Sequence, residues 1–182
     1  EIRQLIEHEF SDATLAFTRD LFVFACFTAL SFADIRELTT DEIMDVNGEK
    51  WIISKRHKTG VPFQVKLLDI PLQIIGKYRP FQKDNSVFGE INYWNVCKKL
   101  KKVISECGIN KQISFHCSRH TFGTLALSKG MPIESVSRVL GHTNIKTTQI
   151  YAKITTQKLG DDLTAFGNQL NQTFGNIKVA GT

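Results

Sequence analysis

Three short motifs in the second half of the chain hold side chains that can do acid–base, electrostatic and nucleophilic chemistry. They are His116-Cys-Ser-Arg119, Leu140-Gly-His142 and Tyr151. An imidazole transfers protons near neutral pH, a guanidinium is a permanent, fork-shaped cation, and a phenol oxygen can form a covalent intermediate. A single histidine or tyrosine on a helix is usually structural, so no motif decides the function alone. Their combination points to catalysis.

The first motif also holds potential zinc ligands. His116 and His120 are four residues apart, which places both on one face of a helix, and Cys117 lies between them. A fourth ligand at a plausible spacing is missing. We therefore predict no metal site and no cofactor.

The composition is typical of one folded domain, with a tail at most. The chain has 182 residues, and its 42% hydrophobic content is enough for a core. The net charge of +5 favours a polyanionic partner. Four cysteines without a CxxC pair indicate a reduced, cytoplasmic setting, and the apolar stretch 21–30 is too short for a membrane span. The polar opening, residues 1–9, suggests a domain cut from a longer protein.

Hydrophobic periodicity predicts a mainly helical fold with a small antiparallel sheet. The strands are expected over residues 50–54 and 62–67, as a hairpin whose basic tip is 55–60, with a short third strand at 87–88. Helices are predicted over residues 12–30, 71–78, 92–107, 115–128, 132–140, 144–155 and 159–174. Lys58 lies in the second half of the hairpin tip, and Tyr151 lies in the helix predicted over residues 144–155.

The motifs together resemble the signature of the tyrosine recombinases, or phage-type integrases. That signature is His-x-x-Arg, then Leu-Gly-His about two dozen residues later, then a nucleophilic tyrosine nine residues after that histidine. His116, Arg119, His142 and Tyr151 match it in order and spacing. The resemblance covers about residues 12–160 and is closest to integrases of bacterial conjugative transposons and other mobile elements. It implies the recombinase catalytic-domain fold.

The resemblance also implies a mechanism, site-specific recombination or integration by DNA strand cleavage and rejoining. Tyr151 would attack the scissile phosphorus and form a 3′-phosphotyrosine, without ATP or metal. Arg119 would stabilise the transition state, His116 would reach the same phosphate or assist proton transfer, and His142 would donate to a phosphate oxygen. Lys58 would be the general acid that protonates the leaving 5′ oxygen.

One catalytic arginine of the family is missing, because Ser31 stands at its position. Either the enzyme is impaired, or an arginine from elsewhere fills the gap, the candidates being Arg19, Arg36 and Arg56. Arg19 lies on the buried stripe of its predicted helix and is our first choice as the substitute. Against it stands a separation from Ser31 of roughly 18 Å along a straight helix. A pairing with a core carboxylate such as Asp20 or Asp34 would also explain a buried Arg19.

The resemblance implies double-stranded DNA as the partner, and we expect Arg56, Thr59 and Lys146 to contact it. Residues 1–158 would be the catalytic domain, preceded by a separate DNA-binding domain. The helix and tail at 159–182 carry an apolar stripe that folds back onto its own core or docks on a neighbouring subunit. In the second case the protein would be a homotetramer on DNA, and a monomer in isolation.

Three alternatives stay open. A type IB topoisomerase-like enzyme uses the same tyrosine chemistry. A degenerate recombinase would bind DNA without cutting it. A non-catalytic helix-turn-helix module would fit the rhythm of residues 133–151, with Gly141 at the turn.

Overall fold

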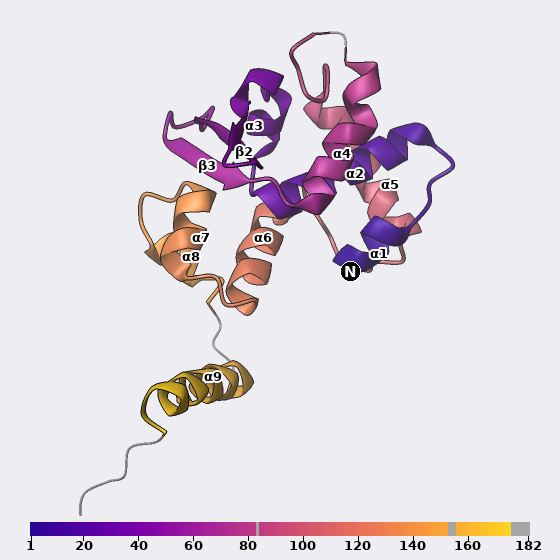
Figure 1. Cartoon of the computed structure of the whole chain (residues 1–182). Coiled ribbons are helices and arrows are strands. Elements are labelled where there is room, and N and C mark those ends of the chain that lie inside the picture. The colour runs from indigo at the N-terminus through magenta and orange to yellow at the C-terminus, as the bar shows by residue number, and fades with distance from the viewer. Residues whose placement is uncertain (83, 153–155, 176–182) are drawn as a thin grey trace, which may run out of the picture. The chain divides into compact units, whose positions relative to one another are not determined.

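The structure, a computed structural model, describes residues 1–82, 84–152 and 156–175. The chain divides into two units, residues 1–151 and residues 152–182 (Figure 1). The first unit combines helices with a small antiparallel sheet, and the described part of the second is a helix. The predicted fold class, mainly helical with a small antiparallel sheet, is confirmed.

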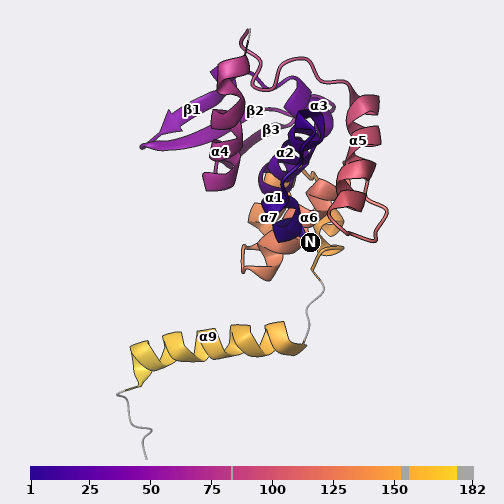
Figure 2. The same cartoon turned by 90° about the vertical axis from the view of Figure 1, so that its right-hand side faces the viewer.

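Helix α2 (Ala13–Thr28) forms the core of the first unit. Its N-terminus is capped by Asp12, whose carboxylate accepts a hydrogen bond from the Thr14 N–H at 2.7 Å. Apolar residues lie on all sides of α2, so the helix is buried. Figure 2 shows the sheet and α4 on one side of α2 and α5 on the other. The helices that pack against α2 are α1 (Ile2–Glu7), α4 (Asp69–Tyr78), α5 (Tyr93–Glu106) and α6 (Cys117–Ser128).

Within the described residues the sheet has three antiparallel strands, β1 (Ile43–Val46), β2 (Glu49–Lys55) and β3 (Pro62–Lys66), in that order. The predicted β2–β3 hairpin is confirmed, but the sequence analysis missed β1. The turn between β1 and β2 is Asn47-Gly48, both with positive φ (55° and 81°), which is a typical two-residue hairpin signal.

The strand predicted at residues 87–88 is wrong. Val87 and Phe88 are both buried in the core, so they do not alternate between two faces of a sheet. In this region the described pairing is an isolated bridge between Ser86 and Thr39. Short connecting elements complete this part of the unit: α3 (Phe32–Arg36), η1 (Thr40–Glu42) and η2 (Arg79–Phe81).

Helices α6, α7 (Ile133–Leu140) and α8 (Lys146–Gln149) form the rest of the first unit, with α7 below β3 in Figure 1. Residues of α6 and α7 share a small second core around Ala29, Val136 and Leu140. The helix predicted over 144–155 is wrong in length, since α8 ends at Gln149 and Tyr151 lies in the following turn. The last three predicted positions, 153–155, lie outside the described residues.

The described helix of the second unit is α9 (Thr156–Phe174), which agrees with the helix predicted over 159–174. Its apolar residues Leu159, Leu163, Phe166 and Leu170 are 50, 60, 55 and 40% exposed. The tail 176–182, predicted to be frayed, lies outside the described residues. Among the helices that the structure describes, none has the length and apolar character needed to cross a membrane.

Candidate active site

Arg119, on the first turn of α6, ties three helices together. Its guanidinium donates hydrogen bonds to the carbonyl oxygens of Ala29, which ends α2, and Leu140, which ends α7. Burial, and after it the positive charge of Arg56, lowers the pKa of Arg119 to about 10. The side chain therefore remains a cation at neutral pH.

A second arginine, Arg56, lies beside the first and follows directly after β2. The sequence predicts a DNA contact for Arg56 from a polar loop, but its side chain turns into the protein, and the residue is 6% exposed. Its Nη1 donates to the Asp34 carboxylate at 2.8 Å and to the Ala29 carbonyl at 3.4 Å, and its Nη2 donates to the Val139 carbonyl. The guanidinium carbon lies 4.1 Å from the centre of the Phe63 ring.

The carboxylate of Asp34 holds Arg56 in place. It also accepts hydrogen bonds from the His57 N–H at 3.0 Å and from the Ser31 N–H and hydroxyl at 3.0 and 2.8 Å. Burial disfavours the ionised carboxyl, but these hydrogen bonds and the charge of Arg56 outweigh it and hold the pKa of Asp34 below its usual value. Ser31, at the position of the missing arginine, is thus the cap of α3 and a partner of the carboxylate that orients Arg56.

The two guanidinium groups converge on one carbonyl oxygen, that of Ala29. Gly141 of the Leu-Gly-His motif makes room for them, because it has a φ of 68° and a Cβ there would lie 3.0 Å from the Nε of Arg56. Among the described residues, this buried Nε has no hydrogen-bond partner. Neighbouring buried cations destabilise each other, whereas an anion between them would stabilise both. The pair therefore suits a phosphate.

The charge of Arg119 contributes to lowering the pKa values of both His116 and His142. Burial, and then the charges of His120 and Arg119, lowers the pKa of His116. Burial, and then the charge of Arg119 and of other nearby cations, lowers the pKa of His142. The Nδ1 of His142 lies 2.9 Å from the hydroxyl of Thr148, which fixes the orientation of its ring. Both imidazoles are therefore mainly neutral at pH 7.

Tyr151 lies half-buried at the end of the first unit. Its ring packs against the small second core, and its centroid lies 5.3 Å from that of His120. Burial raises the pKa of Tyr151, and the charge of Arg119 opposes the rise. The phenol is protonated at neutral pH, so its attack on a phosphate requires a proton acceptor.

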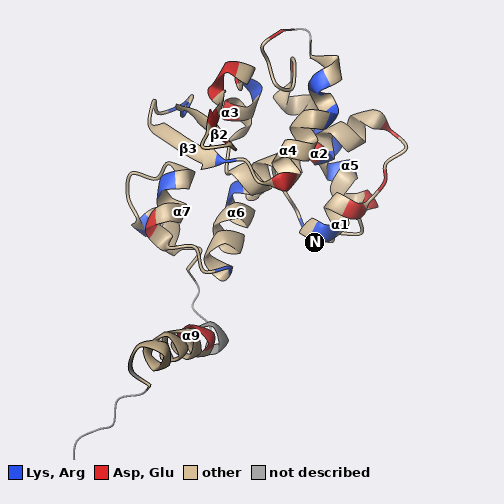
Figure 3. Cartoon of the chain, viewed as in Figure 1, with Lys and Arg blue, Asp and Glu red and all other residues tan. Residues whose placement is uncertain are grey.

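Other predicted site residues lie on the surface. Lys58 and Thr59 are exposed in the turn of the β2–β3 hairpin, and Lys146 is exposed at the start of α8. Figure 3 shows Lys and Arg residues on α4 and α5 as well as on the elements of the site, so charge alone does not mark the site. The structure brings together the arginine pair, the two histidines and the tyrosine, and leaves Lys58 at the hairpin tip.

Arg19 has a different place from the one the sequence predicts. Its Nη1 donates to the carbonyl oxygens at the end of α1, those of Leu5, Ile6 and His8. Its Nε donates to the carboxylate of Asp20 at 2.6 Å. Arg19 therefore holds α1 against α2, and the arginine beside Arg119 is Arg56. The structure shows the pairing of Arg19 with Asp20, one of the two core carboxylates that the sequence offers.

Comparison with known proteins decides the family. The model of the phage integrase family matches residues 1–158. The chain belongs to this family. It is 32% identical to the tyrosine recombinase XerA of Pyrococcus horikoshii over 136 residues, which are 69% of this chain and 47% of that protein. It is 42% identical over 69 residues to XerD of Listeria monocytogenes, 38% of this chain and 22% of that protein. The chain thus spans less than half the length of these relatives.

Solved structures agree with the family in fold. The chain superposes on the XerH recombinase in its post-cleavage complex with a palindromic difH substrate with a TM-score of 0.71 and 19% identity, over 91% of this chain and 50% of that one. For the Tn1549 transposon integrase in complex with circular intermediate DNA, the TM-score is 0.66 and the identity 16%, over 84% and 59% of the chains. The predicted recombinase catalytic-domain fold is confirmed.

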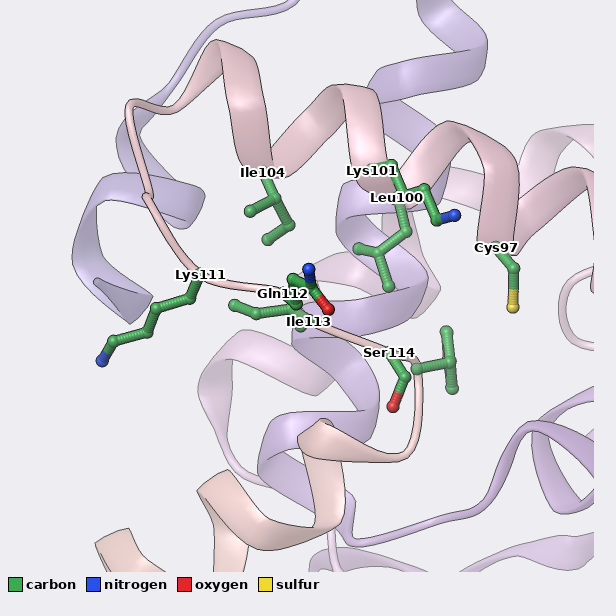
Figure 4. Close-up of a pocket in the computed structure, with 9 residues that line it drawn as sticks. Cys97, Leu100, Lys101, Ile104, Lys111, Gln112, Ile113 and Ser114 are labelled. Atoms are coloured by element: carbon green, nitrogen blue, oxygen red, sulfur yellow. The ribbon is translucent and has the colours of Figure 1, made fainter.

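A separate hollow lies between α5 and the segment that leads to α6 (Figure 4). It has a volume of about 590 Å³ and is lined by residues such as Cys97, Lys101 and Ile113. The arginine pair and Tyr151 do not line it. In the described part of the chain, no three His, Cys, Asp or Glu side chains gather in a way that could hold a metal ion.

Proposed function

We propose that the protein cleaves and rejoins DNA strands through a 3′-phosphotyrosine, with site-specific recombination or integration as the outcome. The convergence of Arg119 and Arg56 on the Ala29 carbonyl, close to Tyr151, carries this proposal. A DNA phosphate seated between the two guanidinium groups would be neutralised on both non-bridging oxygens. Family membership and the DNA complexes of XerH and the Tn1549 integrase support DNA as the substrate.

Each residue of the site has a role in this proposal. Tyr151 attacks the phosphorus, and the arginines Arg119 and Arg56 stabilise the charge of the transition state. His116, neutral at pH 7, accepts the phenol proton. With Nδ1 of His142 accepting a hydrogen bond from the Thr148 hydroxyl, the Nε2–H of the neutral ring would be free to donate to a phosphate oxygen. We assign Arg56, in place of Arg19, as the substitute for the arginine missing at Ser31.

The exposed hairpin tip completes the site on DNA. Lys58 follows shortly after the anchored Arg56, so the hairpin can carry its ammonium group to the leaving 5′ oxygen when DNA is bound. There it would act as the general acid. Thr59 and Lys146, both exposed, are assigned to contacts with the DNA backbone.

The whole protein would work as an assembly on DNA. Residues 1–158 would form the catalytic domain, and a DNA-binding domain would precede Glu1, as the longer relatives allow. The exposed apolar stripe of α9 would dock on a second copy of this chain and so link a homotetramer. Its DNA substrate and its free cysteines suit the cytoplasm.

A covalent DNA adduct tests the proposal. The protein is incubated with a pool of duplexes that carry a randomised central sequence and a nick, so that the short fragment released by cleavage diffuses away. The wild type should form an adduct that survives denaturation, and Tyr151→Phe should form none. DNA binding without an adduct would mean a degenerate recombinase or a non-catalytic DNA-binding module, while relaxation of supercoiled plasmid by monomers would mean a type IB topoisomerase-like enzyme.

A further inference from the structure

The nucleophile Tyr151 lies where regular secondary structure gives it little support. Helix α8 ends two residues before it, and the compact unit ends at Tyr151 itself. Its backbone N–H donates to the Thr148 carbonyl at 3.0 Å, as in a single turn. Such a turn leaves the direction of the side chain open. The contacts of the ring must therefore decide where the phenol oxygen lies.

Those contacts come from α6. A Cβ built on Gly123 would lie 2.7 Å from Cδ2 and 3.0 Å from Cγ of Tyr151, closer than a methyl group can approach an aromatic ring. The tyrosine ring thus lies directly against the backbone of α6. The ring of His120, on the same helix, meets it at a centroid distance of 5.3 Å and an angle of 65°.

Gly123 has no local reason to be a glycine. It lies inside α6, without the positive φ of the glycines that end helices or form turns. Glycine in a helix interior lowers stability relative to alanine. A close approach of another group is the usual explanation of such a residue, and here the group is the nucleophile.

The spacing of α6 links this contact to the phosphate site. Arg119 and His120 each lie three or four residues from both His116 and Gly123, so the four residues lie on one helix face. The helix that holds the guanidinium of Arg119 thus also holds the ring of Tyr151. A shift of the ring relative to α6 changes the distance from the nucleophile to the phosphate.

We propose that Gly123 and His120 form a seat for the Tyr151 ring and act as positioning residues for the nucleophile. The bare backbone at Gly123 lets the ring approach α6, and the imidazole of His120 fixes its tilt. The catalytic consequence rests on the proposed function, whereas the seat itself is a property of the protein without DNA.

The test compares two glycine-to-alanine variants. Gly123→Ala places a methyl group where it would collide with the Tyr151 ring, while Gly76→Ala in α4 adds the same methyl group in open space. Both gain helix propensity, so only the seat distinguishes them. We expect Gly76→Ala to form adduct at the wild-type rate. Gly123→Ala should keep the wild-type half-saturating DNA concentration and lose on the order of 10²-fold in the single-turnover rate of adduct formation, as a misplaced reacting group does.

Fluorine NMR provides a reading that does not depend on DNA. The chain has three tyrosines, so 3-fluorotyrosine gives three signals, and Tyr151→Phe assigns one of them. Gly123→Ala should shift the Tyr151 signal, and Gly76→Ala should not. An unmoved signal, or a moved signal with an unchanged cleavage rate, would overturn the proposal. A wild type without adduct would contradict the proposed function, while the signal would still decide the seat.

His120 supplies the second variant, which keeps the test valid if Gly123→Ala does not fold. His120→Ala removes the ring contact and should both shift the Tyr151 signal and slow adduct formation. His120→Phe keeps an aromatic face and should restore most of the rate. If His120→Phe is as slow as His120→Ala although the Tyr151 signal stays in place, His120 acts by proton transfer and its positioning role is wrong.

Discussion

At the scale of single residues, the placement of charge matters more than the position in the sequence from which it comes. An arginine side chain can reach one phosphate from several backbone segments, provided that something fixes its guanidinium. The guanidinium of Arg56 is fixed by the Asp34 carboxylate, by the Ala29 and Val139 carbonyls and by the Phe63 ring. The side chain of Ser31 donates to the carboxylate of Asp34 and so helps to hold it. Loss of the usual arginine is therefore compatible with an intact site.

Substitutions of Arg56 test this assignment. Arg56→Ala should slow adduct formation by about 10²- to 10³-fold, the usual effect of losing one transition-state donor. Arg56→Lys keeps the charge without the planar fork, so its rate of adduct formation should lie between those of Arg56→Ala and the wild type. The control is Arg36→Ala, because Arg36 is exposed and pairs with its neighbour Glu37. Since Arg56→Ala also leaves Asp34 buried without its cation, rates are compared below the melting temperature of each variant. Equal rates for Arg56→Ala and wild type would contradict the assignment.

The pH dependence follows from the two histidines. Their pKa values lie below the ordinary value of 6.5 because burial disfavours the charged form. The unfolded chain thus binds protons at a higher pH than the folded one, and these groups lower stability as the pH falls below about 6.5. The imidazoles should stay neutral in mildly acidic solution, so adduct formation should persist there and be lost only at lower pH. NMR titration of His116 and His142 checks whether both pKa values lie below 6.5, and a midpoint above 6.5 for both would contradict the prediction.

The sequence predicted the residues of the candidate site that belong to short motifs at fixed spacing. His116, Arg119, His142 and Tyr151 are recognisable because their types and spacing recur together. Arg56 was only one of three candidate substitutes, and its pairing with Asp34 was not predicted, since that pairing depends on a contact between the hairpin and α3 that no local pattern encodes. One local signal was available, the pair Ser31 and Asp34, which is spaced as a capping box and so indicates where the carboxylate lies.

At the scale of elements, the fold also divides into parts that local sequence patterns predict and parts that depend on tertiary contacts. The buried helix α2 and the β2–β3 hairpin follow from apolar periodicity and turn residues, and both were predicted. Strand β1 was missed although Asn47-Gly48 marks its turn, because its exposed residues give no alternating pattern. The length of α8 could not be predicted either, since Tyr151 leaves the helix to pack on α6.

Arg19 shows how one side chain fixes an element. It ties the end of α1 to α2 through the Leu5, Ile6 and His8 carbonyls and through Asp20. Arg19→Ala should lower the free energy of unfolding by about 2 to 4 kcal/mol, as loss of a buried, multiply bonded cation does. Its adduct rate at low temperature should equal that of the wild type.

The control for Arg19 lies on α1 itself. Arg3 is exposed and pairs with Glu7 across one helix turn, so Arg3→Ala should change the unfolding free energy by at most about 0.5 kcal/mol. Chemical denaturation monitored by circular dichroism measures both variants. A catalytic defect in folded Arg19→Ala, with little loss of stability, would restore Arg19 as the substitute arginine.

At the scale of the whole molecule, α9 carries an apolar stripe whose side chains are 40 to 60% exposed. Leu159, Leu163, Phe166 and Leu170 are spaced by three and four residues, which aligns them in one stripe. A stripe of this kind is costly in water, and on the proposed function a second copy of the chain would be the partner that covers it. Docking of α9 between copies would thus couple cleavage at one site to the presence of its neighbours.

Charged substitutions on the two faces of α9 separate assembly from chemistry. The double variant Leu163→Glu, Phe166→Glu disrupts the stripe, while Asn168→Glu adds charge on the opposite face of the same helix. Because the catalytic side chains belong to the first unit, both variants should keep the melting temperature and form the adduct on a nicked substrate. The double variant alone should lose higher-order complexes on DNA, measured by light scattering, and with them strand exchange. Tetramers that persist in the double variant would show that α9 does not link the copies, and a melting temperature lowered by several degrees would show instead that the stripe packs on its own chain.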